Sequence, residues 1–227
     1  MPRVLTGFTL IELAIVLVVI GLLLGGVLKG QELIESARVR AVITQIDSVK
    51  AAYYAFQDKY RALPGDYPGP HAYANLAGIA SPQVGGNGDG VIQDTAQARE
   101  SLLAWVHLAH ANLITGNYQA RDAHPDPAGE WPRNPYNATL QLRHDADFAG
   151  ANGSLRLNLK TGNQIPARLL AEIDRKIDDG RADSGNFRFS PYSGGGTAPV
   201  AARCYDVRTG LWNAAGGEAN CGAAALF

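Results

Sequence analysis

The sequence predicts an α+β protein in which one long N-terminal helix packs on a loop-rich domain with a small antiparallel sheet. Residues 3–63 contain no proline, and two successive helical patterns fill most of them. Residues 62–227 are rich in glycine and proline and contain short alternating stretches that are typical of strands. Because most of these stretches come late in the sequence and most helical patterns come early, we expect segregated helices and strands.

An apolar stretch from Phe8 to Leu28 follows a short leader that carries Arg3. Every residue in this stretch is apolar, glycine or threonine except Glu12. As a helix rising 1.5 Å per residue, it would measure about 31 Å, which matches the hydrocarbon thickness of a bilayer. Arg3 on the short upstream side favours a cytoplasmic N-terminus with the rest of the protein exported. The stretch therefore predicts a single membrane span over 8–28.

Three other interpretations of this stretch are a cleaved secretory signal, a plain membrane anchor and a buried core helix. A secretory signal has a shorter apolar region with a small-residue cleavage site, and only Gly25, Gly26 and Gly30 offer such a site. A plain anchor gives Glu12 no role, and a core helix is rarely apolar on every face. Because a carboxylate inside a membrane segment costs about 2.5–3.5 kcal/mol on insertion scales, we expect Glu12 to have a partner and a function.

The stretch Gly7–Leu13, GFTLIEL, lies between a short basic leader and an uncharged helix. It resembles the prepilin signal that type IV pilins share with the pseudopilins of type II secretion. The resemblance implies that a prepilin peptidase cuts after Gly7 and that Phe8 becomes an N-methylated N-terminus. It also implies that Glu12 pairs with the α-amino group of a neighbouring subunit, which would remove two costly charges together.

The resemblance further implies a pilin-like fold and a structural subunit that is not an enzyme. Residues 1–7 would be the leader, 8–28 the transmembrane and assembly helix, 29–61 its amphipathic continuation and 62–227 a periplasmic or extracellular head domain. The implied partners are the prepilin peptidase and methyltransferase, copies of this protein or other pilins in a filament, and the bacterial inner membrane. The precursor would cross that membrane once, and its final place would be a periplasmic pseudopilus or a surface pilus.

The sequence departs from many members of the family near Lys29, where a proline would break the helix. Three glycines, Gly25, Gly26 and Gly30, each weaken a helix by about 1 kcal/mol relative to alanine and can loosen it in the same region. A continuous helix and two helices with a break near Lys29 both remain compatible with the sequence. Major pilin, minor pilin and pseudopilin remain open as well.

A second helical pattern continues as far as Arg61. Apolar side chains recur at alternating spacings of four and three residues: Val42, Ile46, Val49, Tyr53, Phe56 and Tyr60. This stripe predicts an amphipathic helix that packs on the domain after it. The stretch from Leu63 to Pro70, LPGDYPGP, ends the pattern, so a helix from Phe8 would be about 80 Å long.

Several shorter elements are expected in the head. Asp94 and Gln97 resemble a capping box ahead of a helical stripe at Ala98, Leu102, Trp105, Ala109 and Leu113. A second helix is expected to begin at Pro166 and to end before Gly180. Alternating or β-prone stretches predict strands over 139–143, 154–159, 187–189 and 203–207.

The two cysteines, Cys204 and Cys221, both lie near the C-terminus. In an exported protein with two cysteines a disulfide is favoured over two free buried thiols. A loop of this size would stabilise the fold by about 3 kcal/mol in the chain-entropy model. Many type IV pilins also have a C-terminal disulfide loop, which agrees with an oxidising periplasm.

The stretch from Gly85 to Ile92, GGNGDGVI, resembles the middle of a calcium loop. Asn87 and Asp89 would supply oxygen ligands, and Asp94 is a further candidate from outside the motif. The first and last ligand positions of an EF-hand loop hold Gly85 and Ala96, so two of its carboxylates are missing. A calcium ion and a plain glycine-rich turn therefore both remain possible, and no cofactor is required.

No catalytic motif stands out in the sequence. His107 and His110 have a spacing that suits a metal, but no third ligand is evident. The net charge is −1 and the 20 basic residues are dispersed, so no nucleic-acid partner is expected. The main alternative to a filament subunit is a membrane-tethered periplasmic binding module or enzyme that does not polymerise.

Overall fold

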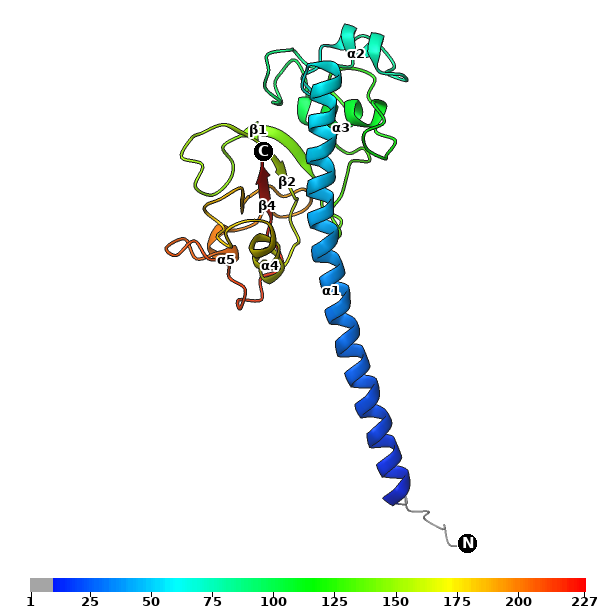
Figure 1. Ribbon diagram of the computed structural model, residues 1–227, viewed down its shortest axis with the longest axis vertical. Coiled ribbons are helices and arrows are strands. Elements are labelled where there is room, and N and C mark those ends of the chain that lie inside the picture. Colours follow the sequence, from blue (N-terminus) through cyan, green and yellow to red (C-terminus); the bar gives the residue numbers. More distant parts are fainter. Residues whose placement is uncertain (1–9) are drawn as a thin grey trace, which may run out of the picture. The chain divides into compact units, whose positions relative to one another are not determined.

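The computed structural model describes residues Leu10–Phe227 and divides into two units, one up to Arg38 and one from Val39 to Phe227 (Figure 1). A single helix, α1 (Leu10–Tyr60), belongs to both. The other elements are α2 (Gly69–Asn75), α3 (Glu100–His110), β1 (Gln141–Asp145), β2 (Arg156–Lys160), α4 (Ala167–Ile177), β3 (Phe187–Phe189), α5 (Ala201–Cys204) and β4 (Ala223–Leu226). A long N-terminal helix and a small antiparallel sheet confirm the α+β prediction.

Helix α1 is uninterrupted over 51 residues. It passes through Gly25, Gly26 and Gly30 without a break, so the alternative of two helices near Lys29 is wrong. Lys29 forms an ion pair of 2.6 Å with Glu32 one turn later. The helix ends at Tyr60, and the next residue, Arg61, adopts a φ of 54° shortly before Leu63 and Pro64. The predicted start at Phe8 lies outside the described residues.

The second part of α1 supplies one wall of the hydrophobic core. The predicted stripe is confirmed: five of its six side chains are buried, Tyr60 is half-buried, and Val39 and Ala52 extend the same face. One continuous cluster joins this face to apolar side chains of α3, α4 and the sheet. Next to Val49 of this stripe, Lys50 donates a hydrogen bond of 2.7 Å to the carbonyl of Leu226, at the end of β4.

The four strands form one antiparallel sheet in the order β1-β2-β4-β3. Leu142 of β1 lies opposite Leu159 of β2, and Leu159 in turn lies opposite Ala225 of β4. Ala225 also lies opposite Phe187 of β3, so the last strand in the sequence is central in the sheet. Strands over 154–159, 139–143 and 187–189 were expected, and the structure contains β2, β1 and β3 at or next to those positions.

Two local predictions need correction. Residues 203–207 do not form a strand: α5 ends at Cys204, and Tyr205 makes only an isolated bridge to Trp212. The helix expected after Asp94 begins later, at Glu100. Asp94 nevertheless caps that helix from a distance, because its carboxylate accepts hydrogen bonds from the backbone nitrogen (3.0 Å) and the hydroxyl (2.8 Å) of Ser101.

Candidate functional site

The N-terminal motif that carries the functional prediction is only partly within the described residues. Gly7 and Phe8, the predicted cleavage and methylation positions, lie outside them. Glu12, the predicted assembly residue, lies in the first described turn of α1 and is exposed. An acidic side chain at that end of a helix is favoured by the helix dipole, so Glu12 is compatible with the helical conformation there.

The apolar part of α1 is exposed on every face. Leu10 is 89% exposed and Leu22 is 74% exposed, and the intervening apolar side chains are exposed as well. This helix is long and apolar enough to cross a membrane, and none of its most apolar 18-residue window is buried. A surface of this kind is stable in a bilayer or against other apolar helices and is costly in water.

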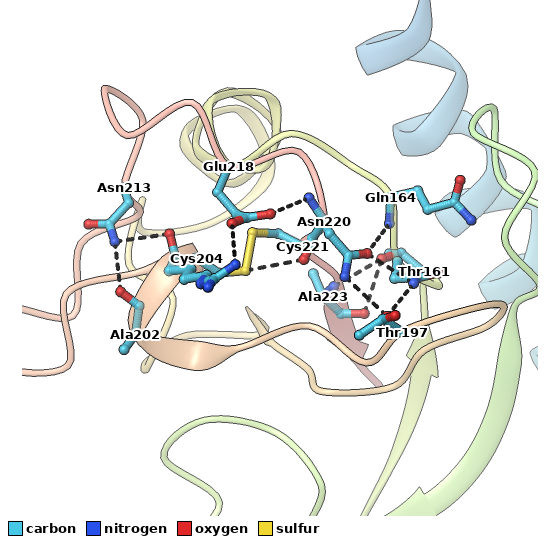
Figure 2. The surroundings of a disulfide bond; sticks show 12 residues. Thr161, Gln164, Thr197, Ala202, Cys204, Asn213, Glu218, Asn220, Cys221 and Ala223 are labelled. Atoms are coloured by element: carbon cyan, nitrogen blue, oxygen red, sulfur yellow. Dashed lines mark hydrogen bonds and ion pairs between the residues drawn. A yellow bond between two sulfur atoms is a disulfide. The ribbon is translucent and has the colours of Figure 1, made fainter.

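The predicted disulfide between Cys204 and Cys221 is present, and both residues are fully buried (Figure 2). Backbone hydrogen bonds hold both ends of the loop that the disulfide closes. The backbone nitrogen of Asn213 donates a hydrogen bond of 2.9 Å to the carbonyl of Cys204, and Cys221 exchanges two backbone hydrogen bonds of 3.1 Å with Ile165. Because β4 begins two residues after Cys221, the disulfide ties the central strand of the sheet to α5.

The same loop is joined to α4 through a buried carboxylate. The indole nitrogen of Trp212 donates a hydrogen bond of 2.6 Å to Asp174 of α4, which also accepts one of 3.0 Å from the backbone nitrogen of Gly180. Burial raises the pKa of Asp174 to about 6 in spite of these donors. Neither partner stood out in the sequence, because no local pattern links an aspartate on a helix to a tryptophan 38 residues later.

The predicted calcium loop is organised around two buried carboxylates from outside it. Asp66 accepts hydrogen bonds from the backbone nitrogens of Gly88 (2.6 Å), Asp89 (3.0 Å) and Gly90 (2.9 Å). Glu100 accepts one of 2.9 Å from Asn87 and one of 2.9 Å from Gln93. Asp66 is 4% exposed and Glu100 is fully buried, and burial raises the pKa of both carboxyl groups. These two acids therefore act as anchors for the loop.

The predicted calcium ligands form hydrogen bonds to different partners. Asn87 and Asp89 are bonded to each other, because the amide of Asn87 donates a hydrogen bond of 2.9 Å to the Asp89 carboxylate. Asp94 is directed to Ser101 instead. Among residues 10–227, the carboxylate oxygens of Asp66, Asp89 and Glu100 lie within 4.8 Å of one another, a spacing that suits one ion. Calcium binding stays a prediction, and the oxygens that would serve it already accept backbone hydrogen bonds.

His107 and His110 do not share a metal-like geometry. His107 is fully buried between aromatic side chains, and its Nδ1 accepts a hydrogen bond of 2.9 Å from the backbone nitrogen of Gly65. Burial lowers its pKa from 6.5 to about 4, so the ring is neutral at physiological pH. Nδ1 of His110 instead lies 2.9 Å from the carbonyl of Ala77. His107 is therefore a core residue that supports the turn after α1.

A buried ion pair within the sheet was missed by sequence reasoning. The ammonium of Lys160 in β2 lies 3.0 Å from the carboxylate of Asp145 in β1, and both side groups are almost inaccessible. Asn158 donates a hydrogen bond of 2.9 Å to the same oxygen of Asp145. The segment that follows β1 covers these polar residues: the carbonyl of Asp147 accepts a hydrogen bond of 3.0 Å from Lys160.

Comparison with protein-family models, with curated proteins and with solved structures finds no match for this protein. The case for a function therefore rests on three features of its own residues: an exposed apolar helix with one acidic residue, an amphipathic continuation within a core, and a disulfide-bonded head.

Proposed function

We propose that this protein is a structural subunit of a type IV pilus or of a type II secretion pseudopilus. One observation carries the proposal: in the sequence the motif GFTLIEL leads into an apolar helix that is exposed on every face from Leu10 to Leu28, and the second part of this helix packs one stripe into the core of a folded head. A soluble protein has no use for such a surface, whereas a subunit held first in a membrane and then in a helical bundle requires it.

The subunit would be made as a precursor in the bacterial inner membrane. Cleavage after Gly7 removes the short leader and creates a free α-amino group on Phe8, which is then N-methylated. Methylation leaves the amine cationic, so it can still form an ion pair. The disulfide of the head supports export to an oxidising compartment, because structural disulfides are rare in the cytosol.

Assembly would depend on Glu12. Inside a membrane the carboxylate of Glu12 and the ammonium of Phe8 are each expensive, and a contact between the two in neighbouring subunits lowers both costs. Apolar contacts between helices do not set how far one helix slides past the next. A single charge pair does, because only one stagger brings the two charges together.

The substitution Glu12→Val tests this role. We expect the variant to insert into the membrane and to fold its head, but to be lost from filaments. Glu32→Val is the matched control, because Glu32 is a carboxylate on the same helix that lies beyond the apolar stretch and pairs with Lys29. Incorporation of Glu12→Val at the level of the control would overturn the assigned role of Glu12.

Electron microscopy of sheared surface filaments, with peptide identification, distinguishes this proposal from a membrane-tethered periplasmic module that does not polymerise. Head peptides in the filament fraction support a pilus subunit. If the head is found in the membrane fraction and its peptides are absent from both surface filaments and a purified secretion pseudopilus, the result supports the tethered module.

A further inference from the structure

Two asparagine–glycine pairs lie at the surface of the head, Asn87-Gly88 and Asn152-Gly153. In such a pair the backbone nitrogen of glycine can attack the amide carbon of the asparagine side group, since glycine has no Cβ to obstruct the approach. The new bond closes a five-membered succinimide, the bond from that carbon to the amide nitrogen of asparagine breaks, and ammonia leaves with the glycine amide proton. Water opens the ring to aspartate or isoaspartate, so no oxidant or cofactor is needed.

At Asn87-Gly88 both reacting groups are held by hydrogen bonds. The nitrogen of Gly88 donates to the carboxylate (2.6 Å) and to the carbonyl (3.1 Å) of Asp66. The amide oxygen of Asn87 accepts a hydrogen bond of 2.9 Å from the backbone nitrogen of Asp89, and the amide nitrogen of Asn87 donates to the Asp89 carboxylate. The nucleophile must therefore leave a charge-assisted hydrogen bond before it can react.

At Asn152-Gly153 neither group is held. The pair occupies the two central positions of a turn in which Ser154 donates a hydrogen bond of 2.9 Å to the carbonyl of Ala151. Asn152 has φ of 49° and Gly153 has φ of 78°, which is the conformation of a type I′ turn. Neither the Asn152 amide group nor the Gly153 nitrogen makes a hydrogen bond to any residue within Leu10–Phe227, and no heavy atom from a described residue outside 152–154 lies within 4 Å of the position a Gly153 Cβ would take.

We propose that Asn152 is a site of spontaneous deamidation in the native protein and that the Asp66 carboxylate protects Asn87 from the same reaction. The reaction converts a neutral amide of the 151–154 turn into a carboxylate. Arg188 donates a hydrogen bond of 3.0 Å to the carbonyl of Gly150 in the preceding residues, so a cation lies close to the new charge. Because the turn is exposed, the head remains folded while its surface charge changes.

The test is a time course of the full-length protein in detergent and mildly alkaline buffer, with peptide mass spectrometry at both asparagines. We expect Asn152 to deamidate roughly 10- to 100-fold faster than Asn87, the rate factor that corresponds to one hydrogen bond to a charged group. In urea, where the fold is lost, the two rates should become similar. Equal rates in the native protein, or faster reaction at Asn87, would overturn the proposal.

Two variants separate the two parts of the proposal. Asn152→Gln should abolish the fast reaction, because the longer side group would have to close a six-membered ring. Asp66→Asn removes the carboxylate that holds Gly88 and should raise the rate at Asn87 while the rate at Asn152 is unchanged. An unchanged rate at Asn87 in Asp66→Asn would show that the protective role assigned to Asp66 is wrong, and an unchanged rate at Asn152 checks that this variant stays folded.

Discussion

The two parts of α1 have the same backbone and opposite surfaces. From Leu10 to Leu28 the apolar side chains point in all directions and all are exposed. From Val39 to Phe56 one stripe of apolar side chains is at most 6% exposed, whereas Tyr54, outside the stripe, is 51% exposed. Helix propensity therefore does not distinguish the parts, but the distribution of apolar residues around the axis does. The first part is suited to a bilayer or to other helices, and the second is suited to the core of its own domain.

The largest difference is expected between two truncations, one in each part. Phe56→Ala removes a fully buried ring that lies against Tyr60, Tyr67 and His107, and it should cost the head about 3–5 kcal/mol of unfolding free energy. Leu22→Ala, at a 74% exposed position, should leave the unfolding of the head unchanged. Denaturant unfolding followed by near-ultraviolet circular dichroism measures both. Equal effects would show that burial does not distinguish the two parts of the helix.

Loss of the disulfide should affect the head alone. Replacement of Cys204 and Cys221 by alanine is expected to lower the unfolding free energy of the head by about 2–5 kcal/mol, since the unfolded polypeptide is no longer constrained. Extraction of the membrane fraction with carbonate should show unchanged insertion. A double variant that unfolds at the wild-type denaturant concentration would contradict the view that this bond secures β4.

A new charge should be tolerated differently by the two parts. Ile20→Arg places a guanidinium in the middle of the apolar part, where it should cost membrane insertion about 2.5–3.5 kcal/mol. Ala55→Arg, at an exposed position of the second part, should change stability by only about 0.5 kcal/mol. The inserted fraction in a translocation assay measures the first effect. Normal insertion of Ile20→Arg would argue that this part does not enter a bilayer.

Mild acid should remove the contribution that His107 makes to the stability of the head. Its pKa is lowered from 6.5 to about 4 by burial, so its contribution to stability is complete above pH 6.5 and is lost as the pH falls toward 4. The loss should be roughly 2 kcal/mol over the first two pH units. Asp174 opposes it: its raised pKa of about 6 adds stability as the pH falls from 6 toward 4.

His107→Asn isolates the histidine, because the asparagine carbonyl can still accept the hydrogen bond from Gly65 but does not titrate. The difference in unfolding free energy between wild type and this variant should therefore become smaller by that amount at low pH. A difference that is constant with pH would mean that the pKa of His107 is the same in the folded and the unfolded head.

The sequence predicts the elements whose pattern is strong and local. The stripe from Val42 to Tyr60, the strand at 187–189 and the Cys204–Cys221 bond all follow from spacing or composition, and the structure confirms them. Strand β4 could not be predicted, because its three alanines have low strand propensity and are buried only by their central place in the sheet.

Contacts between residues that are far apart in the sequence could not be predicted either. Asp66 lies in a proline- and glycine-rich turn and Glu100 in an apolar helix, and nothing in either segment indicates that both hold the loop from Asn87 to Gln93. Glu12, by contrast, stands alone in an apolar stretch and within a motif that could be recognised.

The mass and sequence of the mature N-terminus, taken from the membrane fraction of cells that make the protein, test the proposed function most directly. A prepilin-type subunit predicts a mature protein that begins at Phe8 and carries a methyl group on its α-amino nitrogen. A protein that retains Met1, or one that has been cut after Gly30, would contradict the proposal that this helix is processed for assembly.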